Sequence, residues 1–310
     1  MGRRNRAPPR REKPLIRQVW ASNFDSEISK FDKCLQFHSI LSIDTEFPGF
    51  ITKSPWGSTE EEIYEDFRSN VNQTKLIQLG ITASDNSGQI GGTWEFNFSD
   101  FDPQSDAHGP SSVSFLEDNG MDFQKLKKDG IPITLFTVNF LSIIRKHNVF
   151  RWVTFHGLYD IGYLIKAMGL IAILPESMEE FATVVVEGVG IVRDLKHMSR
   201  FCEGLEDGKL GLERLGQLLN QKRYGWKHNA GSDSLLTASS HLEMMERFGM
   251  DPGICDGFLY GFSNKLESMK MKMKMKMKMK VYHHPKMIRF GQIPWSIPLY
   301  CYTPSYYIAY

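Results

Sequence analysis

Four acidic side chains stand where strands and helices are expected to end or begin, a placement that suits metal-ion chemistry. Asp44 and Glu46 lie two residues apart at the end of the apolar stretch FHSILSIDTEF, so on a strand both point to one face. Asp160 follows the stretch RWVTFHGLY, in the expected first turn of a helix. In KHNAGSDSLLT, Gly231 and Ser232 make a plausible helix start, so Asp233 would occupy the first turn, with His228 five residues earlier in the preceding loop.

These residue types together indicate phosphodiester hydrolysis. Neighbouring carboxylates repel each other unless a cation lies between them. Hard divalent ions such as Mg2+ prefer oxygen ligands and keep several waters. Two such ions about 4 Å apart can activate a water and stabilise the leaving oxygen of an in-line displacement. A His whose pKa lies near neutral is a suitable base for that water.

Each motif taken alone also has a structural interpretation. An Asp-x-Glu pair such as Asp44 and Glu46 also arises by chance on exposed acidic surfaces. Asp160 in a first helical turn also fits capping or a favourable interaction with the helix dipole. A His near a helix start, such as His228, is more often a surface or packed residue than a catalyst. The occurrence of all these motifs in one chain favours a metal-dependent catalytic site over the structural interpretations.

The elements that must position these residues alternate between strand and helix patterns. We expect helices at 24–37, 112–119, 121–129, 134–147, 159–168, 194–201, 212–219 and 234–248, and strands at 39–46, 75–83, 93–98, 151–155 and 181–186. This alternation predicts an α/β domain with a central mixed sheet. Phosphate-loop, dinucleotide-binding, nucleophile-elbow and H-E-x-x-H zinc motifs are all missing from the sequence, which excludes those chemistries.

Composition indicates a folded body with basic ends. The chain has 310 residues, 41% of them hydrophobic, and a net charge of +1. Residues 1–13 carry six basic groups and one acid, and residues 269–310 carry eight basic groups and no acid, so the body between them is acidic. The four cysteines form no C-x-x-C pair, which favours a reducing compartment. No run of 18 or more apolar residues occurs, and the stretch MGRRNRAPPRREKP lacks the apolar segment of a secretory signal, so we expect no membrane partner.

Six consecutive Met-Lys pairs occupy residues 269–280. They fit either a basic tail that binds RNA or a membrane surface, or a low-complexity run without fixed structure, and we favour the second. We therefore expect a basic N-terminal tail at 1–14, a catalytic domain at 15–266, and a tail at 267–310, with both tails lacking fixed structure.

The order Asp-x-Glu, Asp, His-x4-Asp resembles that of the DEDD exonucleases of the His subtype. The segments SIDTEFPGF, KLIQLGIT, WEFNF, FHGLYDIGYLIK, RDLKHM, HNAGSDSLLT and LYGF closely resemble the Caf/Pop-type poly(A) ribonuclease subunit of the Ccr-Not deadenylase complex. The resemblance covers residues 16–262.

The resemblance implies an RNase-H-like α/β fold with a central mixed sheet flanked by helices. It implies 3'-5' removal of poly(A) tails from mRNA 3' ends, releasing 5'-AMP. Carried over by position, Asp44, Glu46, Asp160 and Asp233 would bind two Mg2+ or Mn2+ ions, with Asp44 bridging both, and His228 would be the general base. The family docks on the Not scaffold beside a second, unrelated deadenylase, in cytoplasm and nucleus.

The sequence departs from the family at two places. Gly157-Leu158 replaces the usual Ser-Gly. Residues 178–190 also differ from the family's usual sequence before Asp194, so we leave the strand and loop before Asp194 unassigned. We interpret Asp194 as a structural or helix-capping residue and Phe47 as a core ring rather than a base-stacking one. A weakly active or inactive scaffold paralogue is the alternative function. A DNA exonuclease is disfavoured by the T-E-F-P-G context.

Overall fold

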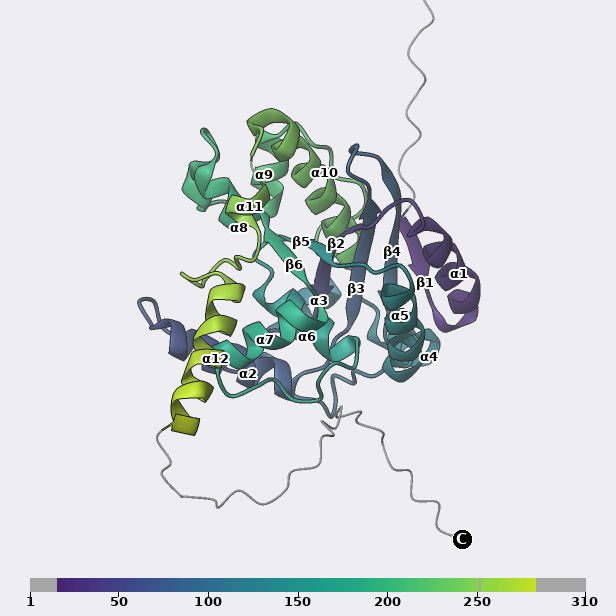
Figure 1. Cartoon of the computed structure of the whole chain (residues 1–310). Coiled ribbons are helices and arrows are strands. Elements are labelled where there is room, and N and C mark those ends of the chain that lie inside the picture. Colours follow the sequence, from purple (N-terminus) through teal and green to yellow (C-terminus); the bar gives the residue numbers. More distant parts are fainter. Residues whose placement is uncertain (1–15, 251, 283–310) are drawn as a thin grey trace, which may run out of the picture.

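The computed structural model describes residues 16–250 and 252–282, which contain a six-stranded sheet (Figure 1). Its order is β1-β4-β3-β2-β5-β6, and its strands are β1 (Ile16–Val19), β2 (Ile40–Glu46), β3 (Gln78–Ser84), β4 (Ile90–Asn97), β5 (Arg151–Thr154) and β6 (Ile191–Asp194). β2 pairs antiparallel with β3 and parallel with β5, β3 and β4 are antiparallel, and the β1–β4 and β5–β6 pairs are parallel. The five neighbouring strands β4-β3-β2-β5-β6 follow the order of an RNase-H-like sheet, and β1 adds a further strand at the edge beside β4. The predicted mixed sheet is confirmed.

Helices cover both faces of the sheet (Figure 1). They are α1 (Phe24–Cys34), α2 (Glu60–Gln73), α3 (Ser112–Asp118), α4 (Phe123–Asp129), α5 (Ile133–Lys146), α6 (Leu158–Ala167), α7 (Met178–Gly188), α8 (Leu195–Met198), α9 (Leu212–Leu218), α10 (Ala230–Phe248), α11 (Pro252–Cys255) and α12 (Leu266–Tyr282). Among the described residues, none of these helices has the length and apolar character that a membrane span requires.

The two faces of the sheet differ in polarity because strand residues alternate between them. One face carries Ile43, Ile81 and Trp94 in register, and these residues pack with α1, α5 and α6 in the main core. The opposite face carries Asp44, Gly80 and Glu95 in register, and α10 packs against it. The acidic end of β2 therefore faces α10 and not the apolar core.

One predicted strand is wrong, because residues 181–186 lie in the helix α7. Ser177 caps this helix by accepting a hydrogen bond from the Glu180 backbone N–H at 3.2 Å. Phe181, Ala182 and Val185 recur at helical spacing and are fully buried. Packing of that stripe outweighs the strand propensity of the Val run. The strand before Asp194, left open by the sequence, is β6.

The expected helix and strand positions elsewhere agree with the structure to within a few residues. The sequence interpretation did not include α2, although Thr59 and Glu62 form a capping box at its start, with the Thr59 N–H donating to Glu62 Oε2 at 2.8 Å. A Thr three residues before a Glu is a recognisable helix-start signal, so this helix was detectable.

The Met-Lys run differs from its expectation, because residues up to 282 belong to α12. Unbranched Met and Lys side chains are good helix formers, and α7 supplies a surface to pack on. Met269 is 3% exposed, Lys270 Nζ lies 2.9 Å from Glu187 Oε1, and Thr183 Oγ1 donates to Met273 Sδ at 3.4 Å. The predicted tail at 1–14 and residues 283–310 lie outside the described residues.

Candidate active site

The end of β2 presents its two carboxylates toward the start of α10. Asp44 and Glu46 are both partly buried, and Asp44 pairs in register with Gly80 on β3. A Cβ atom at Gly80 would lie 1.9 Å from the Ala230 carbonyl oxygen. Only a glycine there lets the first turn of α10 lie directly on the sheet.

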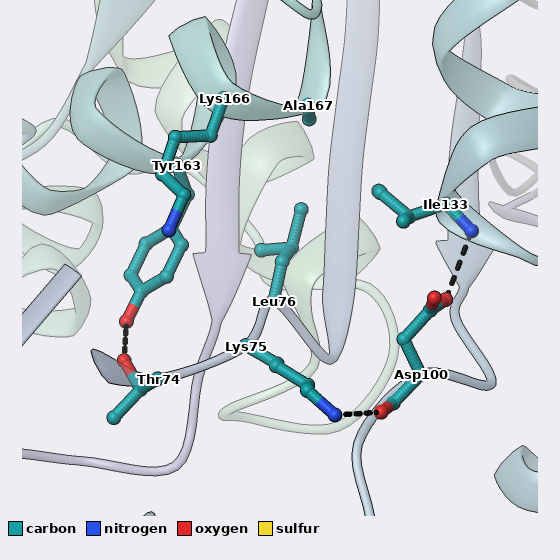
Figure 2. Close-up of a pocket in the computed structure, with 8 residues that line it drawn as sticks. All are labelled: Thr74, Lys75, Leu76, Asp100, Ile133, Tyr163, Lys166 and Ala167. Atoms are coloured by element: carbon teal, nitrogen blue, oxygen red, sulfur yellow. Dashed lines mark hydrogen bonds between the residues drawn. The ribbon is translucent and has the colours of Figure 1, made fainter. Parts of the chain in front are cut away.

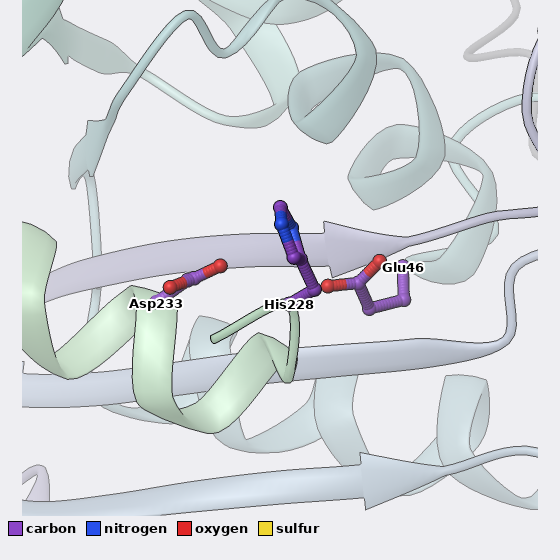
Figure 3. A group of neighbouring side chains, drawn as sticks. All are labelled: Glu46, His228 and Asp233. Carbon is purple, nitrogen blue, oxygen red and sulfur yellow. The ribbon is translucent and has the colours of Figure 1, made fainter. Parts of the chain in front are cut away.

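The start of α10 brings Asp233 and His228 to these carboxylates. Asp233 lies in the first helical turn as predicted and is 8% exposed. The buried Glu95 fixes this turn by accepting from the Gly231 N–H at 2.9 Å. His228, in the preceding loop, has a left-handed φ of 61°. Figure 3 shows Glu46, His228 and Asp233 converging, and one ligand atom from each lies within 4.8 Å of the others.

Asp160 reaches the same place from the other face of the sheet. It lies in the first turn of α6, is 7% exposed, and accepts a hydrogen bond from Thr45 Oγ1 at 2.5 Å. Thr45 stands between Asp44 and Glu46 and points away from α10 because strand residues alternate. The hydrogen bond therefore places the Asp160 carboxylate beside the acidic strand end.

Asp194 holds the loop before α6. It is fully buried and accepts hydrogen bonds from the backbone N–H groups of His156, Gly157, Lys196 and Tyr260, at 2.9 to 3.0 Å. Because its side chain caps α8 through Lys196, the predicted capping role is confirmed. Phe47 stacks on Tyr159 with ring centroids 5.2 Å apart and packs against the core, as expected for a core ring.

Burial and mutual repulsion perturb the titration of these carboxylates. Burial raises the pKa of Asp44 and of Glu46 well above the ordinary value, and the charges of Asp233 and Asp160 raise both further. Burial also raises the pKa of Asp160 to about 7, although the hydrogen bond from Thr45 opposes that shift. Cations placed among these groups would relieve the repulsion.

Burial lowers the pKa of His228, with the nearby Asp233 carboxylate opposing the shift. The imidazole is therefore neutral at pH 7 and able to accept a proton. Its ring meets that of Phe115 edge to face, with centroids 4.9 Å apart. The structure thus brings all five predicted residues to one place, while their chemical roles stay predictions.

Sequence reasoning missed Arg223, which is bonded to the site. Its Nη1 donates to an oxygen of Asp233 and, at 3.0 Å, to Ser232 Oγ, while its Nε donates to Glu213 Oε2 at 2.6 Å. Nothing in the spacing singles out this arginine. The only available signal was its position in the loop that also carries His228.

The sequence of this chain is similar to that of known ribonucleases. Residues 19–134 match the model of the CAF1 family ribonuclease. The probable CCR4-associated factor 1 homolog 1 of Arabidopsis thaliana is 40% identical over 250 residues, which cover 80% of this chain and 69% of that protein. The chain belongs to the CAF1 ribonuclease family. The predicted resemblance to the Caf/Pop-type ribonucleases is confirmed, whereas the His subtype stays a prediction.

Solved CAF1-family structures share the fold. S. pombe Pop2p in a form with bound Mg2+ and Mn2+ is 32% identical, with a TM-score of 0.70, and the alignment covers 80% of this chain and 99% of that one. A yeast CAF1 co-crystallised with the NOT1 MIF4G domain is 24% identical, with a TM-score of 0.67 over 82% of this chain and 100% of that one.

The donor set of this CAF1-family chain fits hard divalent ions. Four carboxylates and one imidazole meet at a partly buried position, and no cysteine lies among them. Oxygen-rich sets of this kind suit Mg2+ and Mn2+. Burial and the neighbouring negative charges disfavour the ionised forms of Asp44, Glu46 and Asp160 without cations, so the residues present fit bound divalent ions.

A separate cavity of about 230 Å³ lies where α5 and α6 meet the chain segment leading into β3 (Figure 2). Its polar groups already have partners within the protein: Lys166 Nζ donates to the Val71 carbonyl at 2.7 Å, and Lys75 Nζ donates to the Asp100 carbonyl at 2.9 Å. None of the five site residues lines this cavity. It therefore offers no reactive group comparable to those at the end of β2.

Proposed function

We propose that this protein is a Mg2+- or Mn2+-dependent 3'-5' exoribonuclease that shortens the poly(A) tails of mRNA and releases 5'-AMP. The observation that carries the proposal is the convergence of Glu46, His228 and Asp233 within 4.8 Å, with Asp44 and Asp160 beside them. Family membership supports ribonuclease chemistry, and the Mg2+ and Mn2+ bound to S. pombe Pop2p support the choice of metals.

Each residue has a defined task in this proposal. Asp44, Glu46, Asp160 and Asp233 would hold two divalent ions, which supply charge to stabilise the leaving oxygen and activate the attacking water. His228, neutral because of burial, would accept the proton of that water. Thr45 orients the Asp160 carboxylate, and the first turn of α10 fixes Asp233.

The direct test uses the full chain with Mg2+ and a 5'-labelled RNA that ends in an A-tract. We expect a ladder of shortened products and 5'-AMP, with Asp44→Ala losing at least about 100-fold in rate. Asp122→Asn, which changes an exposed capping residue of α4, is the matched control and should keep full activity. A chain that leaves the RNA intact, or an Asp44→Ala variant with unchanged rate, would refute the proposal and leave a scaffold role.

Substrate preference needs its own comparison. The same RNA with a U- or C-tract at its 3' end, and a DNA with an A-tract, should be shortened more slowly than the A-tailed RNA. Equal rates on all of these ends would contradict poly(A) specificity while leaving exonuclease activity in place.

We also propose that the protein works within the Ccr-Not complex, docked on the Not scaffold beside a second deadenylase, in cytoplasm and nucleus. The yeast CAF1 solved with the NOT1 MIF4G domain and the CCR4-associated factor names of the relatives support this partner. Copurification of the purified MIF4G domain with the full chain tests the docking directly. Failure to form a complex at micromolar concentration would contradict it.

A further inference from the structure

The carboxylates of Asp44, Glu46, Asp160 and Asp233 form an acidic cluster. Arg223 lies between one carboxylate of this cluster and one carboxylate outside it. Its Nη1 contacts Asp233, the residue proposed as a metal ligand, whereas its Nε donates to Glu213 Oε2 at 2.6 Å. The side chain is 14% exposed, and that of Glu213 is 39% exposed. The guanidinium therefore has two anionic partners, of which only Asp233 belongs to the cluster.

The charge of Arg223 acts on Asp44 as well as on Asp233. Among the described residues, no other Lys or Arg forms an ion pair with any of the four clustered carboxylates. The guanidinium lowers the pKa of Asp44, opposing the larger upward shifts caused by burial and by the other carboxylates. In the metal-free protein it is thus the cation that offsets part of the repulsion at this site.

We propose that Arg223 is an internal counter-ion that competes with divalent cations for Asp233, and that Glu213 retains it when metal binds. Nη1 then leaves the Asp233 carboxylate while the Nε–Glu213 contact persists. The inference rests on the metal site of the proposed function. Arg223 acts through Asp233, so it is a positioning residue that sets metal affinity.

Competition and simple orientation of Asp233 predict opposite effects on metal affinity. If Arg223 competes, Arg223→Gln removes a fixed positive charge next to the cations, and the Kd for Mn2+ falls at least about tenfold. Glu213→Gln removes the alternative partner, strengthens the hold on Asp233, and raises that Kd several-fold. If Arg223 merely orients Asp233, Arg223→Gln weakens Mn2+ binding instead.

The test is calorimetric titration of the full chain with Mn2+ at pH 7.5, without RNA. Wild type, Arg223→Gln, Glu213→Gln and the control Arg247→Gln are compared. Arg247 pairs with Glu243 near the far end of α10, so its replacement should leave the Kd within about twofold of wild type.

Tighter binding by Arg223→Gln together with weaker binding by Glu213→Gln supports the inference. An unchanged or higher Kd for Arg223→Gln overturns it. If that variant does not fold, an unchanged or lower Kd for Glu213→Gln overturns it. Because no RNA is present, a chain that shows both shifts yet shortens no RNA would refute the proposed function alone.

Discussion

Thr45 Oγ1 donates a hydrogen bond to Asp160 Oδ1 across 115 positions of sequence, at 2.5 Å. This contact joins the apolar-face side of β2 to the first turn of α6. Asp44 and Glu46 flank Thr45 and point to the opposite face, so three consecutive residues of one strand serve the site from both sides. The contact fixes where the fourth carboxylate meets the other three.

Thr45→Val removes this hydrogen bond and should raise the pKa of Asp160 further above 7, because the bond stabilises the ionised carboxylate. A shift of about one unit is expected for the loss of a hydrogen bond to a charged group. The pH at which Mn2+ affinity reaches half its plateau should move upward by up to that amount, because Asp44 and Glu46 also titrate there. Thr45→Ser keeps the hydroxyl and should titrate like wild type, and coincident curves for all three proteins would rule out the role of this bond.

The metal-free protein should lose stability as pH rises from about 4 to about 7. Burial raises the pKa of Asp160 from 3.8 to about 7 in the folded state, so the folded protein binds more protons than the unfolded chain across that window. The loss from this residue alone is about 4 kcal/mol of unfolding free energy.

Mg2+ should offset that loss, since it binds the ionised carboxylates. The gain in melting temperature on adding Mg2+ should therefore be larger at pH 8 than at pH 5. Thermal melts with and without Mg2+ measure the gain, and Asp160→Asn should reduce the pH dependence of the metal-free protein. A gain that is constant with pH would contradict this prediction.

Gly80→Ala should damage the site without touching any proposed ligand. The added Cβ would lie 1.9 Å from the Ala230 carbonyl oxygen, so the first turn of α10 must move and carry Asp233 with it. We expect a loss of about 2–4 kcal/mol of stability and at least tenfold weaker Mn2+ binding. Gly211→Ala is the control, because no atom lies within 4 Å of its added Cβ. Normal metal binding by Gly80→Ala would disprove the close approach.

Asp194→Asn should destabilise the protein strongly, because the buried carboxylate accepts from backbone N–H groups on three segments. An amide offers one oxygen and places its NH2 group against remaining donors, which costs about 3–5 kcal/mol at a buried charged network. Denaturant unfolding measures this cost. The exposed capping residue Asp122, replaced by Asn, should change stability by less than about 0.5 kcal/mol, and equal effects of the two substitutions would count against the bridging role.

Two neighbouring methionines of the repeat test whether α12 belongs to the fold. Met269 is 3% exposed, whereas Met271 is 63% exposed. Met269→Asp should cost about 2–4 kcal/mol of unfolding free energy, because it buries an unpaired charge. Met271→Asp should cost less than about 0.5 kcal/mol. Similar small effects of both substitutions would show that the repeat does not pack on α7.

The sequence was most informative where chemistry restricts residue type. The spacing of Asp44 and Glu46 and the helix starts before Asp160 and Asp233 were predictable because strand alternation and first-turn positions are local properties. The predicted strand at 181–186 failed because its Val run carries strand propensity, while the burial that decides the matter depends on distant aromatic residues such as Phe67.

The role of Arg223 and the packing of α12 depend on contacts between distant parts of the chain, which the spacing of residues in the sequence does not reveal. Arg223 joins the site through side-chain bonds to two separate helices, and nothing local distinguishes it from a surface arginine. α12 was missed for a related reason, since alternating Met and Lys produce no apolar stripe along a helix, and only the surface of α7 selects Met269 for burial.

The repeat in α12 makes the packing on α7 independent of the number of Met-Lys pairs that follow the first ones. Every Met-Lys pair is identical, so gaining or losing one pair leaves the sequence of the first pairs unchanged. Met269, Lys270 and Met273, which make the described contacts, would keep their places against α7. Each added pair would lengthen the helix by about 3 Å at its distal end. Chains that differ only in repeat number should therefore share the same folded body.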